Sequence, residues 1–144
     1  MRTLPVTAFA LLVVTGCASG PEAPRSDIQA VVESLATKHP DCVRLTVHAV
    51  PPAGGEVIAV ASTSSAKLGK PSDPEDLQAM KSGQAVMLDE PGALDCTFPM
   101  LYVSGKWTAA CGVTMKSEAG ANREQLIARA AEIAKAVETS MTPK

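Results

Sequence analysis

Residues 97–115, TFPMLYVSGKWTAACGVTM, contain two stretches of alternating side chains on either side of Ser104-Gly105. A period of two is typical of β-strands, and a two-residue connection that contains glycine favours a tight hairpin turn. With this turn, residues 97–103 run antiparallel to residues 106–115, and Tyr102 lies opposite Trp107. The sequence therefore predicts a long β-hairpin.

The two faces of this hairpin differ in the size of their side chains. One face is expected to carry Phe98, Met100, Tyr102, Trp107, Ala109, Cys111, Val113 and Met115, which include three of the four aromatic residues of the chain. The opposite face carries Thr108, Ala110, Gly112 and Thr114. Because small residues leave room above a strand, a helix or a ligand can approach the second face closely.

Three further strands are predicted upstream of the hairpin. Residues 43–50 alternate, with Arg44, Thr46 and His48 on one side, and residues 56–61 (EVIAVA) are apolar on both faces. A strand without a polar face is typical of a sheet that is covered on both sides. Residues 85–89 form the last of the three, and Glu90-Pro91-Gly92 then turns the chain.

Helices are expected before, between and after the strands. Ser26 and Gln29 have the spacing of a capping box, and the first helix ends near Lys38. The middle helix starts at Pro74, after Ser72 or Asp73 as N-cap, and Gly83 follows its end. A third helix covers residues 122–141 and is expected to pack on the sheet.

The resulting order of elements resembles a PAS-like fold, and in particular the Cache-type extracytoplasmic sensor domains. The resemblance is carried by Ala61-Ser62-Thr63, by residues 67–76 (KLGKPSDPED) and by the closing hairpin at residues 99–107. It implies an α+β domain with a five-stranded antiparallel sheet in the order 2-1-5-4-3, flanked by N-terminal, middle and C-terminal helices. It also implies a small pocket between sheet and middle helix, where such domains bind organic acids or amino acids.

The N-terminal residues have the features of an export signal. An apolar run over residues 4–14 follows the basic Arg2, and it is shorter than the about 20 residues that span a bilayer. Val14-Thr15-Gly16-Cys17 resembles the lipobox of bacterial lipoproteins, which implies cleavage before Cys17 and attachment of acyl chains such as palmitate. In that family Asp after the cysteine favours the inner membrane, so Ala18 implies the outer membrane, with the domain in the periplasm. We expect a signal peptide over residues 1–16, a lipid-anchored tether over residues 17–25 and one domain over residues 26–144.

Composition narrows the possible functions. The formal net charge is −2 and no basic run exists, so we expect no nucleic-acid partner. No cofactor or metal motif is present, and the spacing of His39 and Cys42 is poor for a metal site.

The candidate ligand-binding residues are Arg44, His48, Tyr102, Trp107 and Thr108. Two alternatives stay open: Arg44, Thr46 and His48 form a strand face that lies under solvent or a loop, and the aromatic pair is core packing.

Three cysteines follow Cys17 in the sequence. In the predicted register Cys96 is level with Val113, so Cys96 and Cys111 are diagonal neighbours on one face. Diagonal positions are slightly too far apart for a disulfide unless a bulge closes the gap. A Cys96–Cys111 bridge is the tentative assignment, and a bridge from Cys42 or no bridge remains open.

These observations predict a lipid-anchored, periplasmic, sensor-like domain that binds a small organic acid or amino acid. The chain ends after one amphipathic helix, so we expect no output module of its own. We expect no enzymatic activity, and the membrane is a partner through the N-terminal lipid. Two alternatives are a non-catalytic lipoprotein that holds another envelope protein and a thiol-dependent enzyme.

Overall fold

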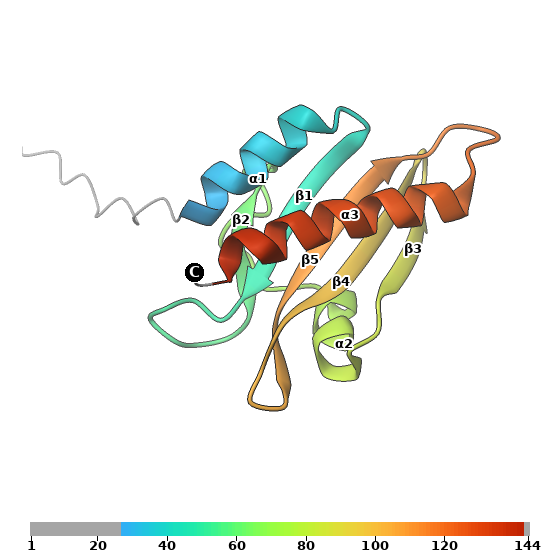
Figure 1. The fold of residues 1–144 in the computed structure, drawn as a ribbon. Helices are drawn as coiled ribbons and strands as arrows, with labels where there is room; N and C mark the ends of the chain where they lie inside the picture. Colours follow the sequence, from blue (N-terminus) through green and yellow to red (C-terminus); the bar gives the residue numbers. More distant parts are fainter. Residues whose placement is uncertain (1–26, 143–144) are drawn as a thin grey trace, which may run out of the picture.

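The computed structural model describes residues 27–142, which form an α+β domain with one five-stranded antiparallel sheet (Figure 1). The strand order β2-β1-β5-β4-β3 is the one expected from the sequence. In chain order the elements are α1 (Asp27–Lys38), β1 (Cys42–Ala49), β2 (Ile58–Ser62), α2 (Pro74–Ser82), β3 (Val86–Glu90), β4 (Ala93–Val103), β5 (Lys106–Lys116) and α3 (Arg123–Met141). The predicted signal peptide, Cys17 and the tether lie outside the described residues.

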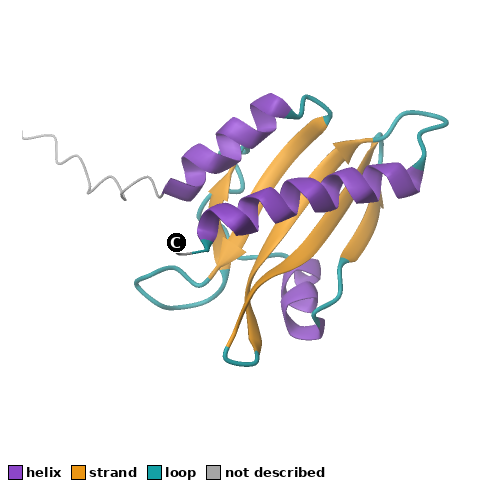
Figure 2. Ribbon diagram, in the orientation of Figure 1, coloured by secondary structure: helices purple, strands orange, loops and turns teal. Residues whose placement is uncertain are grey.

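The helices divide between the two faces of the sheet. Helices α1 and α3 lie side by side across one face, and the short helix α2 lies on the other (Figures 1 and 2). α1 contacts β1, β2 and α3, whereas α2 contacts β3, β4 and β5. Between residues 27 and 142, no helix has the length and apolar character needed to cross a membrane.

The apolar core lies between the sheet and the α1–α3 layer. Alternate residues of the three central strands point into it and are almost fully buried: Leu45, Val47, Leu94, Cys96, Met100, Cys111, Val113 and Met115. Val32, Ile133 and Val137 meet them from the helices. Full burial of one such aliphatic side chain contributes about 1.5–3 kcal/mol, so this layer supplies most of the apolar stabilisation.

The register of the β4–β5 hairpin is the one predicted. Tyr102 pairs with Trp107, Phe98 with Cys111, and Cys96 with Val113. The start of β4 was predicted wrongly, because the strand begins at Ala93 rather than at residue 97. Leu94 and Cys96 enter the apolar core, so strand alternation places Asp95 between them on the α2 side of the sheet.

The expected face of the aromatic pair is also wrong. Leu101 has a φ of +57°, and its N–H donates to Glu138 Oε1 at 3.0 Å instead of to β5. This kink interrupts the alternation, so Leu101 packs against the core. Tyr102 is 61% exposed, and Trp107 lies against Gly83 at the end of α2. The pair therefore lies outside the core that contains Met100.

Gly83 ends α2 in a conformation that few other residues adopt. Its φ is +69°, and its N–H donates to Ala79 O at 2.9 Å. A Cβ built on Gly83 would lie 2.5 Å from Nε1 of Trp107. Glycine is therefore required both by the left-handed backbone and by the indole ring beside it.

We predict that Gly83→Ala destabilises the domain by about 2–4 kcal/mol, since strain of the left-handed backbone adds to the clash with Trp107. Gly92→Ala is the matched control, because Gly92 has a φ of +73° but open space around its Cα. That variant should lose only about 1 kcal/mol. Urea unfolding followed by Trp107 fluorescence measures both, and equal losses would show that the indole contact is unimportant.

Candidate functional site

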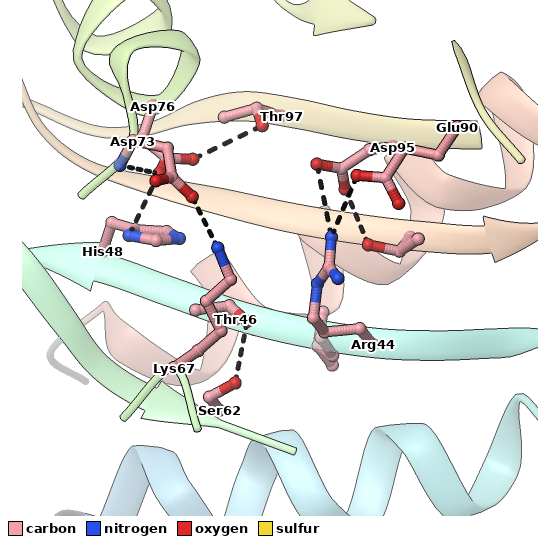
Figure 3. A network of polar contacts seen from close by, with 12 residues as sticks. Arg44, Thr46, His48, Ser62, Lys67, Asp73, Asp76, Glu90, Asp95 and Thr97 are labelled. Carbon is pink, nitrogen blue, oxygen red and sulfur yellow. Dashed lines mark hydrogen bonds and ion pairs between the residues drawn. The ribbon is translucent and has the colours of Figure 1, made fainter. Parts of the chain in front are cut away.

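A polar cavity lies between α2 and the sheet, on the face opposite the apolar core. Its volume is about 20 Å³, which is room for about one water molecule. Its lining combines charged and polar side chains from β1, β4, α2 and the loop before α2 with one glycine of β5: Arg44, Thr46, His48, Lys67, Asp73, Glu75, Asp76, Asp95 and Gly112. Figure 3 shows how most of these side chains converge.

Strand alternation brings the sheet residues of the cavity together. Arg44, Thr46 and His48 point to the α2 side of β1, since Leu45 and Val47 between them enter the apolar core. Thr46 and His48 are 4% and 5% exposed, so they do not lie under solvent, and α2 and the loop before it cover this face. Gly112 on β5 has no side chain, and His48 Nε2 points toward it.

His48 and Asp76 form the deepest contact of the site. His48 Nδ1 lies 2.8 Å from Ser72 Oγ and 3.3 Å from Asp76 Oδ2. Asp76 Oδ2 also accepts the N–H of Asp73 at 2.9 Å, and Thr97 Oγ1 donates to Asp76 Oδ1 at 3.5 Å (Figure 3). The carboxylate of Asp76 thus joins α2 to β1 and to β4, and it also caps the N-terminus of α2 through the N–H of Asp73.

Burial changes the protonation of this pair. It lowers the pKa of His48 to about 4, although the carboxylate of Asp73 acts in the opposite direction. It raises the pKa of Asp76 to about 6, against the lowering effect of the Asp73 N–H. The imidazole is therefore neutral at pH 7, and Asp76 takes up a proton in mildly acidic solution.

Arg44 and Asp95 form the second half of the site. Asp95 Oδ1 accepts the hydroxyl of Thr114 at 2.7 Å, and Asp95 Oδ2 lies 3.7 Å from Nη2 of Arg44. The same guanidinium nitrogen is 3.5 Å from Glu90 Oε1. Arg44 is therefore held by two carboxylates while 30% of its side chain remains exposed, so it stays accessible to an anion.

Lys67 lies at the mouth of the cavity. Its Nζ is 2.6 Å from Asp73 Oδ2, and the two side chains are 39% and 46% exposed. An ion pair this exposed contributes at most about 1 kcal/mol. Breaking the Lys67–Asp73 ion pair at the mouth therefore costs little free energy.

The structure separates the five ligand-binding residues predicted from the sequence. Arg44 and His48 line the cavity, whereas Tyr102 and Trp107 line a separate open groove. Thr108 lines neither, and its hydroxyl donates to Leu101 O at 2.8 Å. Asp76, Asp95 and Lys67 were not recognised from the sequence.

A signal for Asp95 was present in the sequence. Leu94, Cys96, Phe98 and Met100 alternate, so extending the strand backwards places Asp95 and Thr97 on the same face as Arg44. Asp76 and Lys67 belong to a helix cap and a loop. Only the tertiary structure brings them to the cavity.

The three described thiols are free and buried, and the tentative Cys96–Cys111 disulfide is not formed. The unbroken register explains this, because Cys96 faces Val113 and Cys111 faces Phe98 without a bulge. Burial raises the pKa of Cys42 and of Cys96 to about 11 and raises that of Cys111 further. No cluster of three metal-ligating side chains exists in residues 27–142.

The chain is similar to solved structures in its fold, but not to known protein families or curated proteins in its sequence. No protein-family model and no curated protein matches the sequence. A free methionine-R-sulfoxide reductase from Neisseria meningitidis, solved with its substrate, is similar with a TM-score of 0.55 and 12% identity, over 80% of this chain and 75% of that one. A GAF domain/HD domain protein from Geobacter sulfurreducens is similar with a TM-score of 0.54 and 15% identity, over 85% and 94%.

The PixJ GAF domain of Thermosynechococcus elongatus, in its blue-light absorbing form, has a TM-score of 0.51 and 19% identity, over 79% of this chain and 84% of that one. Identities this low establish the fold alone. The chain thus has a GAF- and PAS-like fold, and its resemblance to Cache-type domains in particular remains a prediction.

The two shifted pKa values predict opposite pH dependences for two variants. Because the pKa of His48 is lower in the folded state, the free energy of unfolding decreases as the pH drops from 6.5 toward that folded pKa. Because the pKa of Asp76 is higher in the folded state, the free energy of unfolding decreases as the pH rises from 3.8 through that folded pKa. In the wild type the slopes largely cancel, because folded and unfolded pairs both hold about one proton between pH 4 and 6.

We expect Asp76→Asn to gain roughly 2–3 kcal/mol of stability, relative to its own value at pH 4.5, when the pH is raised to 6.5. His48→Gln should show the reverse slope, since only Asp76 then titrates. Urea unfolding at several pH values measures both variants. Slopes of the same sign would contradict the assigned directions of the pKa shifts.

Proposed function

We propose that this chain is a lipid-anchored, periplasmic domain that binds a small molecule, and that its ligand is an α-amino acid or a zwitterion of similar size held in the cavity beneath α2. The observation that carries this proposal is the burial of His48, Asp76 and Asp95 where a helix packs on a sheet. Apolar side chains stabilise such a contact better, because a buried ionisable group costs several kcal/mol of desolvation. Clusters of this kind concentrate at functional sites.

The arrangement of charges favours a zwitterion over a simple organic acid. Arg44 and Lys67 are partly exposed cations near the mouth, suited to a carboxylate. Asp76 and Asp95 are more deeply buried and suited to an ammonium group. A ligand ammonium beside Asp76 would stabilise the ionised carboxylate, so binding near pH 6 should release a proton.

A ligand larger than water requires α2 to move away from the sheet. Only Asp76 and Ala79 of this helix are buried, and Leu77 is 45% exposed. The helix is nine residues long and is attached at its start by exposed contacts such as Lys67–Asp73. An element with so little apolar burial opens at low cost compared with the core.

Two further points support binding of a small molecule. The free methionine-R-sulfoxide reductase of this fold acts on an amino-acid derivative, as its name states. The three described thiols, of Cys42, Cys96 and Cys111, lie in the apolar core with raised pKa values, away from the cavity. We therefore favour binding over thiol-dependent catalysis.

Thermal unfolding with a panel of the twenty amino acids tests this function. A ligand at 100 times its Kd should add about 2.7 kcal/mol to the free energy of unfolding. Its N-acetyl and amide derivatives should stabilise far less, because each lacks one of the two charges. Asp95→Asn keeps an acceptor for Thr114 and should remove the stabilisation while leaving the apo protein folded.

Lys38→Gln is a suitable control, since Lys38 is exposed at the end of α1. It should keep the full ligand effect. If no amino acid stabilises the wild type, or if Asp95→Asn responds like the wild type, this assignment of the site fails.

The anchoring part of the proposal rests on residues 14–17 and needs a separate test. Expressed in a diderm bacterium, the wild-type chain should incorporate labelled palmitate and partition with the membrane. Cys17→Ser should lose both the label and the membrane association, whereas Cys42→Ser should keep them. An unprocessed N-terminus found by mass spectrometry would refute lipidation.

A further inference from the structure

A groove of about 560 Å³ lies between α2 and the tip of the β4–β5 hairpin. Its lining comes from two elements: Leu77, Met80, Lys81 and Ser82 on α2, and Tyr102, Gly105, Lys106 and Trp107 on the hairpin. None of these residues lines the polar cavity. The groove is therefore separate from the site proposed above, and its volume is within the range of small-molecule sites.

The aromatic wall of the groove is held in place from two sides. Trp107 lies against Gly83, where a side chain of any size would displace the indole. Tyr102 packs on Trp107 with ring centroids 5.0 Å apart and planes tilted by 55°. The kink at Leu101 turns this pair out of the apolar core, so a rigid aromatic surface faces α2 instead of being buried.

The groove combines exposed apolar surface with positive charge. Leu77 is 45% exposed and Tyr102 is 61% exposed. Lys81 and Lys106 flank the groove, and no Asp or Glu belongs to its lining. Neither lysine takes part in an ion pair in the described part of the chain. A net positive, partly apolar groove is complementary to an anion that carries an apolar body.

We infer that this groove is a second binding site, which takes a small carboxylate with an aromatic or aliphatic body. The body stacks between Trp107 and the apolar side chains of α2, and the carboxylate lies between Lys81 and Lys106. The ligand class differs from that of the polar cavity, where a zwitterion meets carboxylates as well as cations. The concave shape and the volume favour a small molecule over a flat membrane surface.

Trp107 makes this inference directly testable, because it is the single tryptophan of the chain. Phenylacetate, phenylacetamide and 2-phenylethylammonium are probes with one aromatic body and three charges. Phenylacetate should change Trp107 fluorescence saturably, with the amide at least fivefold weaker and the cation at least tenfold weaker. With a Kd of about 1 mM, about 20 mM phenylacetate is twenty times the Kd and nearly saturates the site. The inference is overturned if Trp107 fluorescence shows no saturable change at that concentration. It is also overturned if all three probes bind with equal affinity.

Variants of exposed residues assign the effect to the groove. Lys81→Gln combined with Lys106→Gln should weaken phenylacetate at least fivefold and leave the amide unchanged, whereas the control Lys38→Gln should change neither. Leu77→Ala should weaken both probes by a similar factor of about two to ten, as expected for removal of apolar contact. Phenylacetate binding should persist in Asp95→Asn, so failure at one site is distinguishable from failure at the other. Loss of the signal in Lys38→Gln or in Asp95→Asn would overturn the assignment to this groove.

Discussion

The position of α2 depends on one buried contact, between the imidazole of His48 on β1 and the carboxylate of Asp76 on the helix. The two side chains approach to 3.3 Å and are 7% and 5% exposed. Because α2 buries only Asp76 and Ala79, it is held on the sheet chiefly by polar groups. The pKa values of both residues are shifted toward the neutral forms, so the contact avoids two isolated charges in a poorly solvated place. Both candidate sites have α2 as one wall, and both therefore depend on this contact.

The two faces of the sheet separate the apolar core from the candidate site. On one face, alternate residues of β1, β4 and β5 meet α1 and α3 in a closed apolar layer. On the other face, the same strands present Arg44, His48, Asp95 and Thr97 to a short helix. Strand alternation makes this separation possible, since neighbouring residues of one strand serve opposite layers. Substitutions in the polar layer can therefore change the site without opening a cavity in the core.

The parts that could be predicted from sequence are those governed by local pattern. Alternation with the Ser104-Gly105 turn predicts the correct hairpin register, and Pro74 and Gly83 correctly mark the start and end of the middle helix. The predictions that failed depend on tertiary contacts. The face of Tyr102 and Trp107 changes because Glu138 on α3 takes the N–H of Leu101, and no local pattern encodes that bond. The predicted strand started at residue 97 and left Asp95 out, and only the fold brings its partners Arg44 and Thr114 beside it.

The two sites cannot be independent if α2 moves as a unit. Asp76 faces the cavity while Leu77, Met80 and Lys81, within the next two turns, face the groove. A shift that widens the cavity for a ligand also moves one wall of the groove relative to Trp107. The close contact between Gly83 and the indole limits that shift at the end of α2, so the helix is freer to move at its start, near Asp73. By thermodynamic linkage, a ligand that prefers one position of α2 changes the affinity of the second site for its own ligand, and that second ligand changes the affinity of the first site by the same factor. If both proposed sites bind their ligands, the single short helix α2 couples them.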